Sequence, residues 1–342
     1  MPVLAQLTVA NDNILLWADT GRDREYALDA LALTYVGDYT DSGTQIGDER
    51  LFINGAAVAK RISIEENISR HRAAIGLTGQ MHGAVFLDGD GRVIRPALLW
   101  NDQRTGAERD QIEDRVGAER LRAIAGNPAL TGFQAPKVLW LHHHEPEAYA
   151  RVRALLLPKD FVRFRLTGEL ATDASDAAGT LLLDLKARDW SAEILAALDI
   201  PRDWLPRVHE GRDVTGHVSA DGARPSGLPE GLPVIAGGGD NAAAAVGCGV
   251  IRPGTGLLSL GTSGVVFVPT DELRIDPSGA LHAFCHAVPD KYHLMGVMLS
   301  AGGALRWFRD TLAPEQSAQA RAQGREPYDL MLAEAAAVAP GA

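Results

Sequence analysis

The sequence predicts an α/β fold, because short apolar stretches that fit strands alternate along the chain with segments of helical spacing. AAIGLTGQ (73–80) has the composition of a buried strand that ends in glycine, and PVIAGG (233–238) has the same character. Between them, residues 105–170 place apolar side chains three or four positions apart, with Pro or Gly at segment ends, which is typical of helices. These observations predict layers of helices packed against strands.

Two segments are predicted to be β-hairpins from their turn residues. In LFINGAAVAKRIS (51–63), the dipeptide Asn54-Gly55 separates two β-like runs, and this dipeptide favours a two-residue hairpin turn. In AVFLDGDGRVIRPALLW (84–100), we expect the turn at DGDG, residues 88–91.

The last third of the chain continues the mixture of strands and helices. RPSGLPEGLP (224–233) is rich in Pro and Gly and is the stretch most typical of a linker. LLSLGTSGVVFV (257–268) predicts a strand, a turn and a second strand, whereas residues 298–310 and 328–338 have helical patterns. No internal repeat of about 20–50 residues stands out, so a repeat architecture is not expected.

Composition and charge exclude several classes of protein. The net charge of −11 over 342 residues offers no basic excess for binding nucleic acid or an anionic membrane. The two cysteines, Cys248 and Cys285, cannot form a disulfide framework, and we interpret them as thiols of a reducing compartment. The N-terminus lacks the basic and apolar regions of a signal peptide, and no apolar run reaches about 18 residues. We therefore expect a soluble cytoplasmic protein.

The segment PVIAGGGDNAAAAVGCGV (233–250) carries one charged residue, Asp240, among glycines and alanines. Gly237, Gly239 and Ala242 fit the G-x-G-x-x-A pattern of dinucleotide folds, but the acidic residue expected about 20 positions later is missing. A carboxylate at the end of a strand can instead accept a proton from a substrate hydroxyl, as in kinases. The alternative is structural, with Asp240 capping the helix that begins near Asn241.

A second candidate site is the turn in LSLGTSG (258–264), about twenty residues after Asp240. Gly261, Thr262 and Ser263 would offer backbone N–H groups and two hydroxyls to an anion such as a terminal phosphate. An ordinary polar hairpin turn is the alternative for this stretch.

Two further loops carry polar and aromatic side chains where α/β proteins present ligand-binding residues. TGQMHG (78–83) follows the first buried strand and contains Met81 and His82, although a lone histidine is often structural. ALLWNDQRT (97–105) contributes Trp100 as a flat face for a sugar ring, together with the polar residues Asn101, Asp102 and Arg104. The three histidines 142–144 suggest a solvated helix rather than a metal site, because consecutive helical residues point in different directions.

Taken together, these motifs resemble the FGGY carbohydrate kinases, and within that family most closely the xylulokinases. The resemblance extends from about residue 73 to residue 312 and is carried, in chain order, by GLTGQMHGAVFLD, RPALLWNDQRT, GFQAPKVLWL, LLPKDFVRFRLTGELATDASDAAGTLLLD, RDWS, PVIAGGGDNAAAAVGCGV, LSLGTSGVVF, HAFCHAVP and HLMGVMLSAGGALRWF. It implies two actin-like, ribonuclease-H-like ATPase domains around a cleft. Residues 1–249 would form the N-terminal, sugar-binding domain, with 1–72 atypical, and residues 250–342 an incomplete nucleotide-binding domain.

The resemblance also implies roles for individual residues. Asp240 would be the catalytic base that takes the proton of the sugar's terminal hydroxyl as its oxygen attacks the γ-phosphate of ATP. Met81, His82 and Asn241 match sugar contacts of the family, and Gly261, Thr262 and Ser263 match the turn that approaches the transferred phosphate. Mg²⁺ would arrive with ATP. The substrate implied is D-xylulose, converted to D-xylulose 5-phosphate in pentose catabolism, and the enzyme could form a homodimer.

Two departures from the family pattern qualify this function. The Asp-x-Gly-Thr-Ser phosphate loop expected near the start is not matched by Asp19-Thr20-Gly21, and the glycine-rich adenosine-binding motif is not found after residue 312. We therefore expect feeble or no kinase activity from this chain alone. The alternatives are a non-catalytic sugar-binding protein or a kinase for another pentulose or a polyol. An NAD-dependent oxidoreductase is disfavoured by the missing ribose-binding acid.

Overall fold

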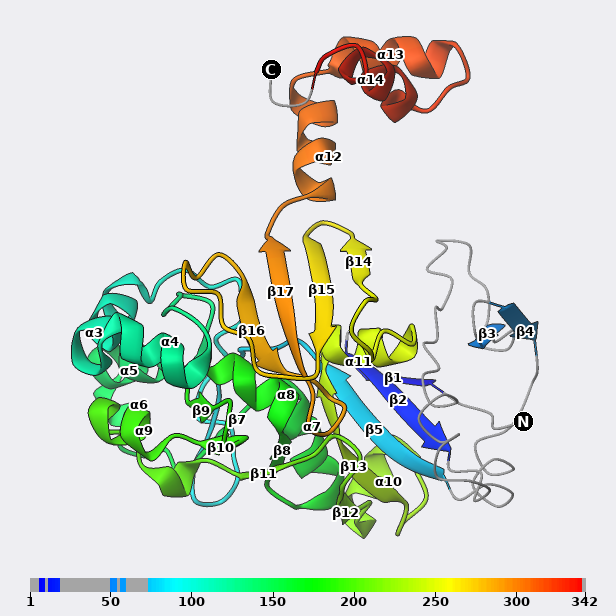
Figure 1. The fold of residues 1–342 in the computed structure, drawn as a ribbon. Coiled ribbons are helices and arrows are strands. Elements are labelled where there is room, and N and C mark those ends of the chain that lie inside the picture. The colour runs from blue at the N-terminus through cyan, green and yellow to red at the C-terminus, as the bar shows by residue number, and fades with distance from the viewer. Residues whose placement is uncertain (1–5, 10–11, 19–49, 54–55, 60–72, 340–342) are drawn as a thin grey trace. The chain divides into compact units, whose positions relative to one another are not determined.

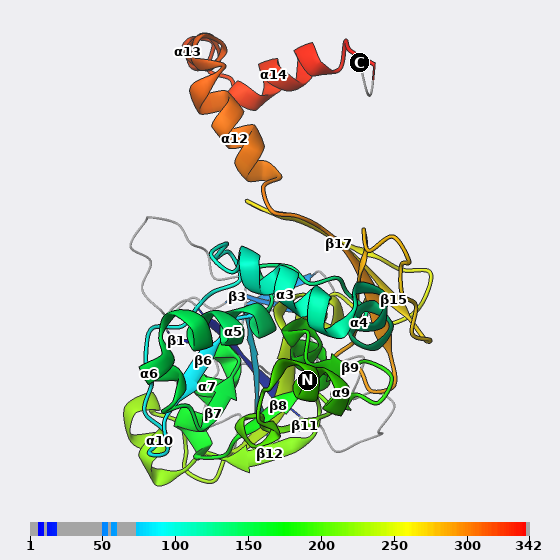
Figure 2. The same cartoon turned by 90° about the vertical axis from the view of Figure 1, so that its left-hand side faces the viewer.

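The computed structural model of the chain describes residues 6–9, 12–18, 50–53, 56–59 and 73–339, and Figures 1 and 2 show it in two views. These residues form two compact units. The first unit comprises residues up to Gly256 together with Phe267–Met295, and the second comprises Leu257–Val266 and Gly296–Ala342.

A five-stranded mixed sheet forms the centre of the first unit. Its order is β1-β2-β5-β13-β12, in which only β5 and β13 run parallel to each other. Their register pairs Thr78 with Gly238 and Gly79 with Gly239, so both strands end at the same edge of the sheet. Loops that leave this edge are where open α/β sheets bind ligands. The strands are β1 (Gln6–Val9), β2 (Asp12–Ala18), β5 (Ala73–Gly79), β13 (Pro233–Gly239) and β12 (Val214–His217).

The parallel pairing contains an irregularity that glycine makes possible. The register between β13 and β5 shifts between Ile235 and Gly238. Gly237, inside this bulge, has φ +76°, and a Cβ there would lie 1.9 Å from the carbonyl oxygen of Leu77. Only a residue without a side chain fits this position, which explains one glycine of the GGG run.

Helices and short strands make up much of the rest of the first unit (Figure 2). The helices are α3 (Gly106–Val116), α4 (Ala118–Ala125), α5 (Gln134–His144), α6 (Pro146–Tyr149), α7 (Pro158–Thr167), α8 (Ala174–Ala177), α9 (Ala192–Leu198), α10 (Ala220–Ser226) and α11 (Asp240–Gly247), with 3-10 turns at Ala178–Thr180 and Arg202–Trp204. The short strands are β3 (Arg50–Ile53), β4 (Ala56–Ala59), β6 (Val85–Leu87), β7 (Ala154–Leu156), β8 (Ala171–Asp173), β9 (Leu183–Asp184), β10 (Asp189–Trp190) and β11 (Arg207–His209).

A four-stranded sheet of order β14-β15-β17-β16 follows along the chain. Its strands are β14 (Leu257–Leu260), β15 (Gly264–Thr270), β16 (His282–Cys285) and β17 (Tyr292–Met298). The second unit continues through α12 (Gly302–Thr311), α13 (Pro314–Ala322) and α14 (Pro327–Ala335), and α13 and α14 pack together (Figure 1).

Most elements expected from the sequence are confirmed. Residues 73–79 and 233–239 form strands, residues 257–260 and 264–270 form the strand–turn–strand, and α12 and α14 occupy the two expected helical segments. The hairpin after Leu87 closes through the bond from the Asp88 N–H to the Arg92 carbonyl, 3.0 Å. Strands β3 and β4 pair antiparallel, whereas the expected turn residues between them and the segment 19–21 lie outside the described residues.

Two expectations are wrong in part. Residues 154–156 lie in the region predicted to be helical, but they form strand β7 because their apolar side chains are buried and pair with β6. The Pro/Gly-rich stretch 224–233 is not a linker between units. Its first part completes helix α10, and the rest connects α10 to β13 inside the first unit.

No helix in the part of the chain that the structure describes is long and apolar enough to cross a membrane.

Candidate active site

Asp240 lies at the edge of the central sheet where β5 and β13 end. It is the first residue of α11 and directly follows Gly239, the last residue of β13. Its Oδ1 accepts hydrogen bonds from the Asn241 backbone N–H at 2.8 Å and from the Asn241 side-chain amide at 3.0 Å. The helix cap is Gly239, and the carboxylate does not make the capping bond that the structural alternative required.

The Asp240 side chain is exposed, yet its pKa is raised above the usual aspartate value. Desolvation by the surrounding protein raises the pKa, and the two bonds from Asn241 oppose that effect. Solvent can reach the Asp240 carboxylate, and so can a ligand, although the surrounding protein partly removes water from it. A raised pKa makes this carboxylate a stronger base than an ordinary surface aspartate.

Met81 and His82 reach the same edge from β5. Met81 is 4% exposed and packs against two glycines. Any side chain at either glycine would collide with Met81. A Cβ at Gly239 would lie 3.0 Å from Met81 Cγ, and one at Gly179 would lie 2.8 Å from Met81 Cε. The structure therefore brings the Met81 side chain against the residue that precedes Asp240.

His82 is held in a defined orientation and in its neutral form. Its φ of +69° is uncommon for a residue with a side chain, and its Nδ1–H donates to the Gly179 carbonyl at 2.6 Å. The ring packs edge-on against Phe133, with centroids 4.8 Å apart. Burial lowers the pKa of His82 to about 4. With the proton on Nδ1, Nε2 is an acceptor for a ligand hydroxyl.

Helix α5 fixes the backbone of this loop with two buried polar side chains. The Gln134 amide donates to the Gly83 carbonyl at 2.8 Å, and Lys137 Nζ donates to the carbonyls of His82 at 2.8 Å and Gly132 at 2.6 Å. Burial lowers the pKa of Lys137 to about 7, and nearby Asp102 opposes that shift. Sequence reasoning missed both residues, although a lysine within the apolar run APKVLWL was a signal that it has a buried partner.

Trp100, Asp102 and Arg104 lie together on a neighbouring loop. Arg104 Nε donates to both carboxylate oxygens of Asp102 at 2.9 Å, and the guanidinium lies over the Trp140 ring, 4.8 Å from its centroid. Burial raises the pKa of Asp102, but the bonds from Arg104 outweigh it and leave the pKa lowered. Trp100 is 36% exposed. Their contact with a sugar stays a prediction.

Gly261, Thr262 and Ser263 belong to the second unit, where they form the turn between β14 and β15. The Gly261 N–H donates to the Ser263 carbonyl at 2.8 Å. The carbonyls of Gly261 and Thr262 accept from the N–H groups of residues 301–303, at the start of α12, at 2.7–3.0 Å. The turn is thus attached to a helix N-terminus, and its contact with phosphate stays a prediction.

Among the described residues, no group of three or more His, Cys, Asp or Glu side chains is arranged to hold a metal ion. His142, His143 and His144 lie at the exposed end of α5, as expected from the sequence. The two cysteines also differ in environment. Cys248 is exposed, whereas Cys285 is buried, and burial raises the pKa of its thiol to about 12. A thiol with so high a pKa is inert, which fits a structural role.

Comparison with known proteins identifies the family to which the chain is similar. The sequence profile of the N-terminal domain of the FGGY family of carbohydrate kinases matches residues 42–247. The match begins within residues 1–72, which the motifs alone left unaligned, and it includes Met81, His82 and Asp240. The chain is also 50% identical over 234 residues to the xylulose kinase of Escherichia coli, covering 68% of this chain and 48% of that protein.

Other relatives agree. The xylulose kinase of Bacillus subtilis is 42% identical over 274 residues, covering 80% of this chain and 55% of that protein. Among solved structures, the xylulose kinase from Rhodospirillum rubrum matches with a TM-score of 0.68 at 33% identity, covering 72% of this chain and 50% of that one. The chain therefore spans about half the length of the relatives it matches. The structural match confirms the actin-like, ribonuclease-H-like fold class.

Proposed function

The chain belongs to the FGGY family of carbohydrate kinases, and on that premise we propose that the whole protein phosphorylates the terminal hydroxyl of D-xylulose with ATP, giving D-xylulose 5-phosphate. The observation that carries the proposal is the shared edge of β5 and β13, where the Met81–His82 loop packs beside Asp240. An acceptor imidazole and a solvent-accessible carboxylate lie on adjacent elements there.

Asp240 is the proposed catalytic base. Both bonds from Asn241 fall on Oδ1, so the proton of the sugar hydroxyl would go to Oδ2. As that proton leaves, the hydroxyl oxygen forms a bond to the γ-phosphorus of ATP, the bond from this phosphorus to the bridging oxygen breaks, and ADP departs. Positioning and charge stabilisation supply most of the rate enhancement in such reactions.

His82, Met81 and Asn241 are the proposed sugar contacts. His82 presents Nε2 as an acceptor because Nδ1–H is donated to Gly179. A hydroxyl on the sugar satisfies this acceptor, whereas a substrate without that hydroxyl leaves it unpaired, and an unpaired buried polar group is costly. Trp100, Asp102 and Arg104 would complete the recognition from the neighbouring loop.

ATP enters as the second substrate, with Mg²⁺. Mg²⁺ would be carried mainly by the phosphates of ATP and by water. Gly261, Thr262 and Ser263 would approach the transferred phosphate, with the Thr262 and Ser263 hydroxyls as donors. Because ATP is a cytoplasmic metabolite, we place the enzyme in the cytoplasm.

The test separates sugar binding from phosphoryl transfer on the 342-residue chain. Calorimetry with D-xylulose measures binding, and a coupled assay of ADP release measures transfer. Asp240→Asn should keep the sugar dissociation constant within about threefold while abolishing the phosphoryl transfer that the wild-type chain shows. Asp110→Asn is the matched control, because Asp110 is an exposed aspartate paired only with Arg109 among the described residues.

The proposal fails if the wild-type chain releases ADP and the Asp240→Asn variant releases it equally fast, or if D-xylulose does not bind. Binding of D-xylulose without ADP release would favour the alternative of a non-catalytic sugar-binding protein for this chain. Tighter binding of D-ribulose or a polyol than of D-xylulose would reassign the substrate within the family.

A further inference from the structure

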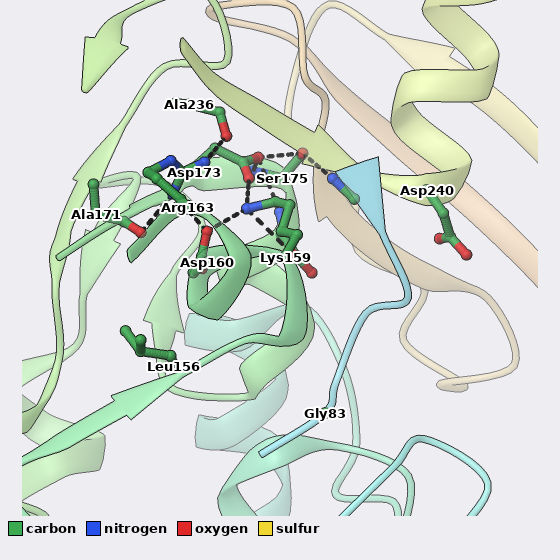
Figure 3. Close-up of polar contacts among 12 residues, drawn as sticks. Gly83, Leu156, Lys159, Asp160, Arg163, Ala171, Asp173, Ser175, Ala236 and Asp240 are labelled. Carbon is green, nitrogen blue, oxygen red and sulfur yellow. Dashed lines mark hydrogen bonds and ion pairs between the residues drawn. The ribbon is translucent and has the colours of Figure 1, made fainter. Parts of the chain in front are cut away.

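A cluster of charged side chains is buried beside β13, and the proposed chemistry does not use it. Lys159, Asp160 and Arg163 come from α7, and Asp173 and Asp176 come from β8 and α8 (Figure 3). Each of these five residues, which we call the charged cluster, is at most 1% exposed.

The charged cluster is connected by ion pairs. Lys159 Nζ lies 2.6 Å from Asp160, 2.7 Å from Asp173 and 3.4 Å from Asp176, and Arg163 lies 2.7 Å from Asp160. Burying charges costs a desolvation penalty that such pairs often only balance, so a buried ion pair is weak grounds for a stabilising role. A cluster of five buried charged residues therefore calls for a structural or functional reason beyond stability.

The contacts of the cluster with β13 suggest that reason. Arg163 donates hydrogen bonds to the carbonyls of Ala171, at 2.6 Å, and of Ala236 on β13. Further along the same strand, the Gly239 N–H donates to the hydroxyl of Ser175 at 3.1 Å. Ser175 in turn donates its hydroxyl proton to Asp173. Two hydrogen bonds therefore hold the last four residues of β13, one at each end (Figure 3).

The last residues of β13 cannot fix their own position by side-chain packing. Gly237, Gly238 and Gly239 have no side chains to pack, and Gly237 lies in the bulge at a positive φ. Glycine backbones are freer than any other, so their position depends on hydrogen bonds to the main chain. Asp240 follows this segment directly, and Figure 3 draws no contact between its carboxylate and the charged cluster. Asp240 and Asp176 also act on each other through space, and the hydrogen-bonded connection between the charged cluster and Asp240 runs through the backbone at Gly239.

We propose that Ser175, oriented by Asp173, is a positioning residue for Asp240: its hydroxyl fixes the Gly239 N–H and thereby sets where the carboxylate of the base lies. Asp173 accepts the hydrogen bond of the Ser175 hydroxyl. This orients the hydroxyl so that an oxygen lone pair points toward the Gly239 N–H. Asp173 is itself fixed by Lys159 and by the N–H groups of Ser175 at 2.9 Å and Asp176 at 3.1 Å. The inference rests on the proposed function only in naming Asp240 as the base.

The test is Ser175→Ala, with Ser191→Ala as the matched control. Ser191 is also a buried serine whose hydroxyl accepts one backbone N–H, that of Ile194 at 3.2 Å, but it caps α9. In the Ser175→Ala variant, amide hydrogen exchange at Gly239 should accelerate at least about tenfold by NMR. The pKa of Asp240, followed by its carboxyl carbon resonance, should fall toward the usual aspartate value as the looser backbone lets in water. Ser191→Ala should change neither quantity.

Kinetics add a readout that a merely structural role would not produce. In protein that turns over, Ser175→Ala should lower kcat about 10- to 100-fold and leave the KM for sugar within about threefold, because a displaced base slows transfer without removing sugar contacts. If Ser175→Ala does not fold, Ser175→Cys keeps the volume with a weaker acceptor, and the same shifts should appear at smaller size.

The proposal is overturned if Gly239 exchange and the Asp240 pKa are unchanged in the Ser175 variant that folds, or if Ser191→Ala changes them equally. These two measurements need no turnover. A chain in which both still respond to Ser175 but which does not bind D-xylulose contradicts the proposed function and supports the positioning role.

Discussion

The charged cluster is buried in the first unit and a group of four histidines is buried or half-buried there, yet the net pKa shifts of their basic groups are opposite. The histidine cluster comprises His82, His282, His286 and His293, whose rings pack around Phe267 and Phe284 at centroid distances of 4.1–6.1 Å. Burial lowers the pKa of all four imidazoles, to about 4 for His82 and for His286. The cluster is therefore neutral at physiological pH.

Lys159 shows the opposite outcome. Burial alone would lower its pKa, but Asp160, Asp173 and Asp176 outweigh burial and raise it. Among the residues that the structure describes, no carboxylate acts on these four imidazoles. The charged groups that act on His286 are the cations Lys291 and Arg188, which lower its pKa further. A buried group thus keeps its charge only where opposite charges touch it.

The two clusters also support different halves of the candidate site. The charged cluster holds β13 and, through Ser175, the backbone before Asp240. The histidine cluster contains His82 itself, the neighbour of Met81 in the chain, whose ring packs against Phe284. Substitutions that remove a counter-charge should therefore lower the free energy of unfolding more than substitutions of a group that is already neutral.

The largest effect is expected from Lys159→Met. Removing this ammonium leaves Asp160 and Asp173 as buried carboxylates without their main counter-charge, which should lower the free energy of unfolding by about 3–5 kcal/mol. Urea denaturation monitored by circular dichroism measures this quantity. Lys186→Met, at an exposed lysine, is the control and should stay within about 0.5 kcal/mol of wild type. A loss below about 1 kcal/mol for Lys159→Met would mean that the cluster is not an ionic unit.

The histidine cluster predicts a loss of stability on acidification. The folded pKa of His286 is about 4 and its unfolded value is near 6.5, so between these values the unfolded chain binds more protons. Stability is fully present above about pH 6.5 and falls as the pH drops toward 4, by about 2 kcal/mol for this residue between pH 7 and 5.

Urea denaturation at several pH values tests this dependence. His286→Gln should reduce the slope of stability against pH over this range, because glutamine does not titrate. His142→Gln, at an exposed histidine of α5, should leave the slope unchanged. Identical slopes in the wild type and in both variants would show that His286 is not held neutral.

Gly179→Ala is expected to have an intermediate effect. A Cβ there would lie 2.8 Å from Met81 Cε and 2.9 Å from His82 Nδ1. The methionine end can bend away, but the imidazole must move and lose its bond to the Gly179 carbonyl, at a cost of about 1–3 kcal/mol. We expect D-xylulose to bind about tenfold more weakly by calorimetry. Gly106→Ala is the control, since nothing lies within 4 Å of its added Cβ. Unchanged D-xylulose binding in both variants would show that the Met81–His82 loop is not part of the sugar site.

Asp176→Asn should have the smallest effect. Desolvation raises the pKa of Asp176 well above normal, and the attraction of Lys159 only partly opposes it. The raised pKa means that burial disfavours the ionised form of this carboxyl group more than Lys159 favours it. Replacing it by an isosteric amide should change the free energy of unfolding by less than about 1 kcal/mol, whereas Asp173→Asn should cost more. Equal losses in the two variants would mean that the carboxyl groups of Asp176 and Asp173 contribute equally to the stability of the charged cluster.

The sequence was sufficient for the elements that local pattern determines. Strands β5 and β13 and helix α11 follow from apolar runs and glycine punctuation, and family motifs named Met81, His82 and Asp240. Residues 154–156 were predicted helical, because their pairing with β6 depends on a segment about seventy positions away. Lys137 and Ser175 were missed for the same reason: their partners, His82 and Gly239, are 55 and 64 positions distant in the chain.

One measurement tests the central claim, that the Met81–His82 loop and Asp240 form a single sugar site. Titration of the chain with D-xylulose can be followed by NMR at the His82 ring nitrogens and at the Asp240 carboxyl carbon, each assigned by its own variant. We predict that both resonances shift and that the two shifts yield the same dissociation constant. A shift at one residue without the other, or at neither at saturating sugar, would contradict the account.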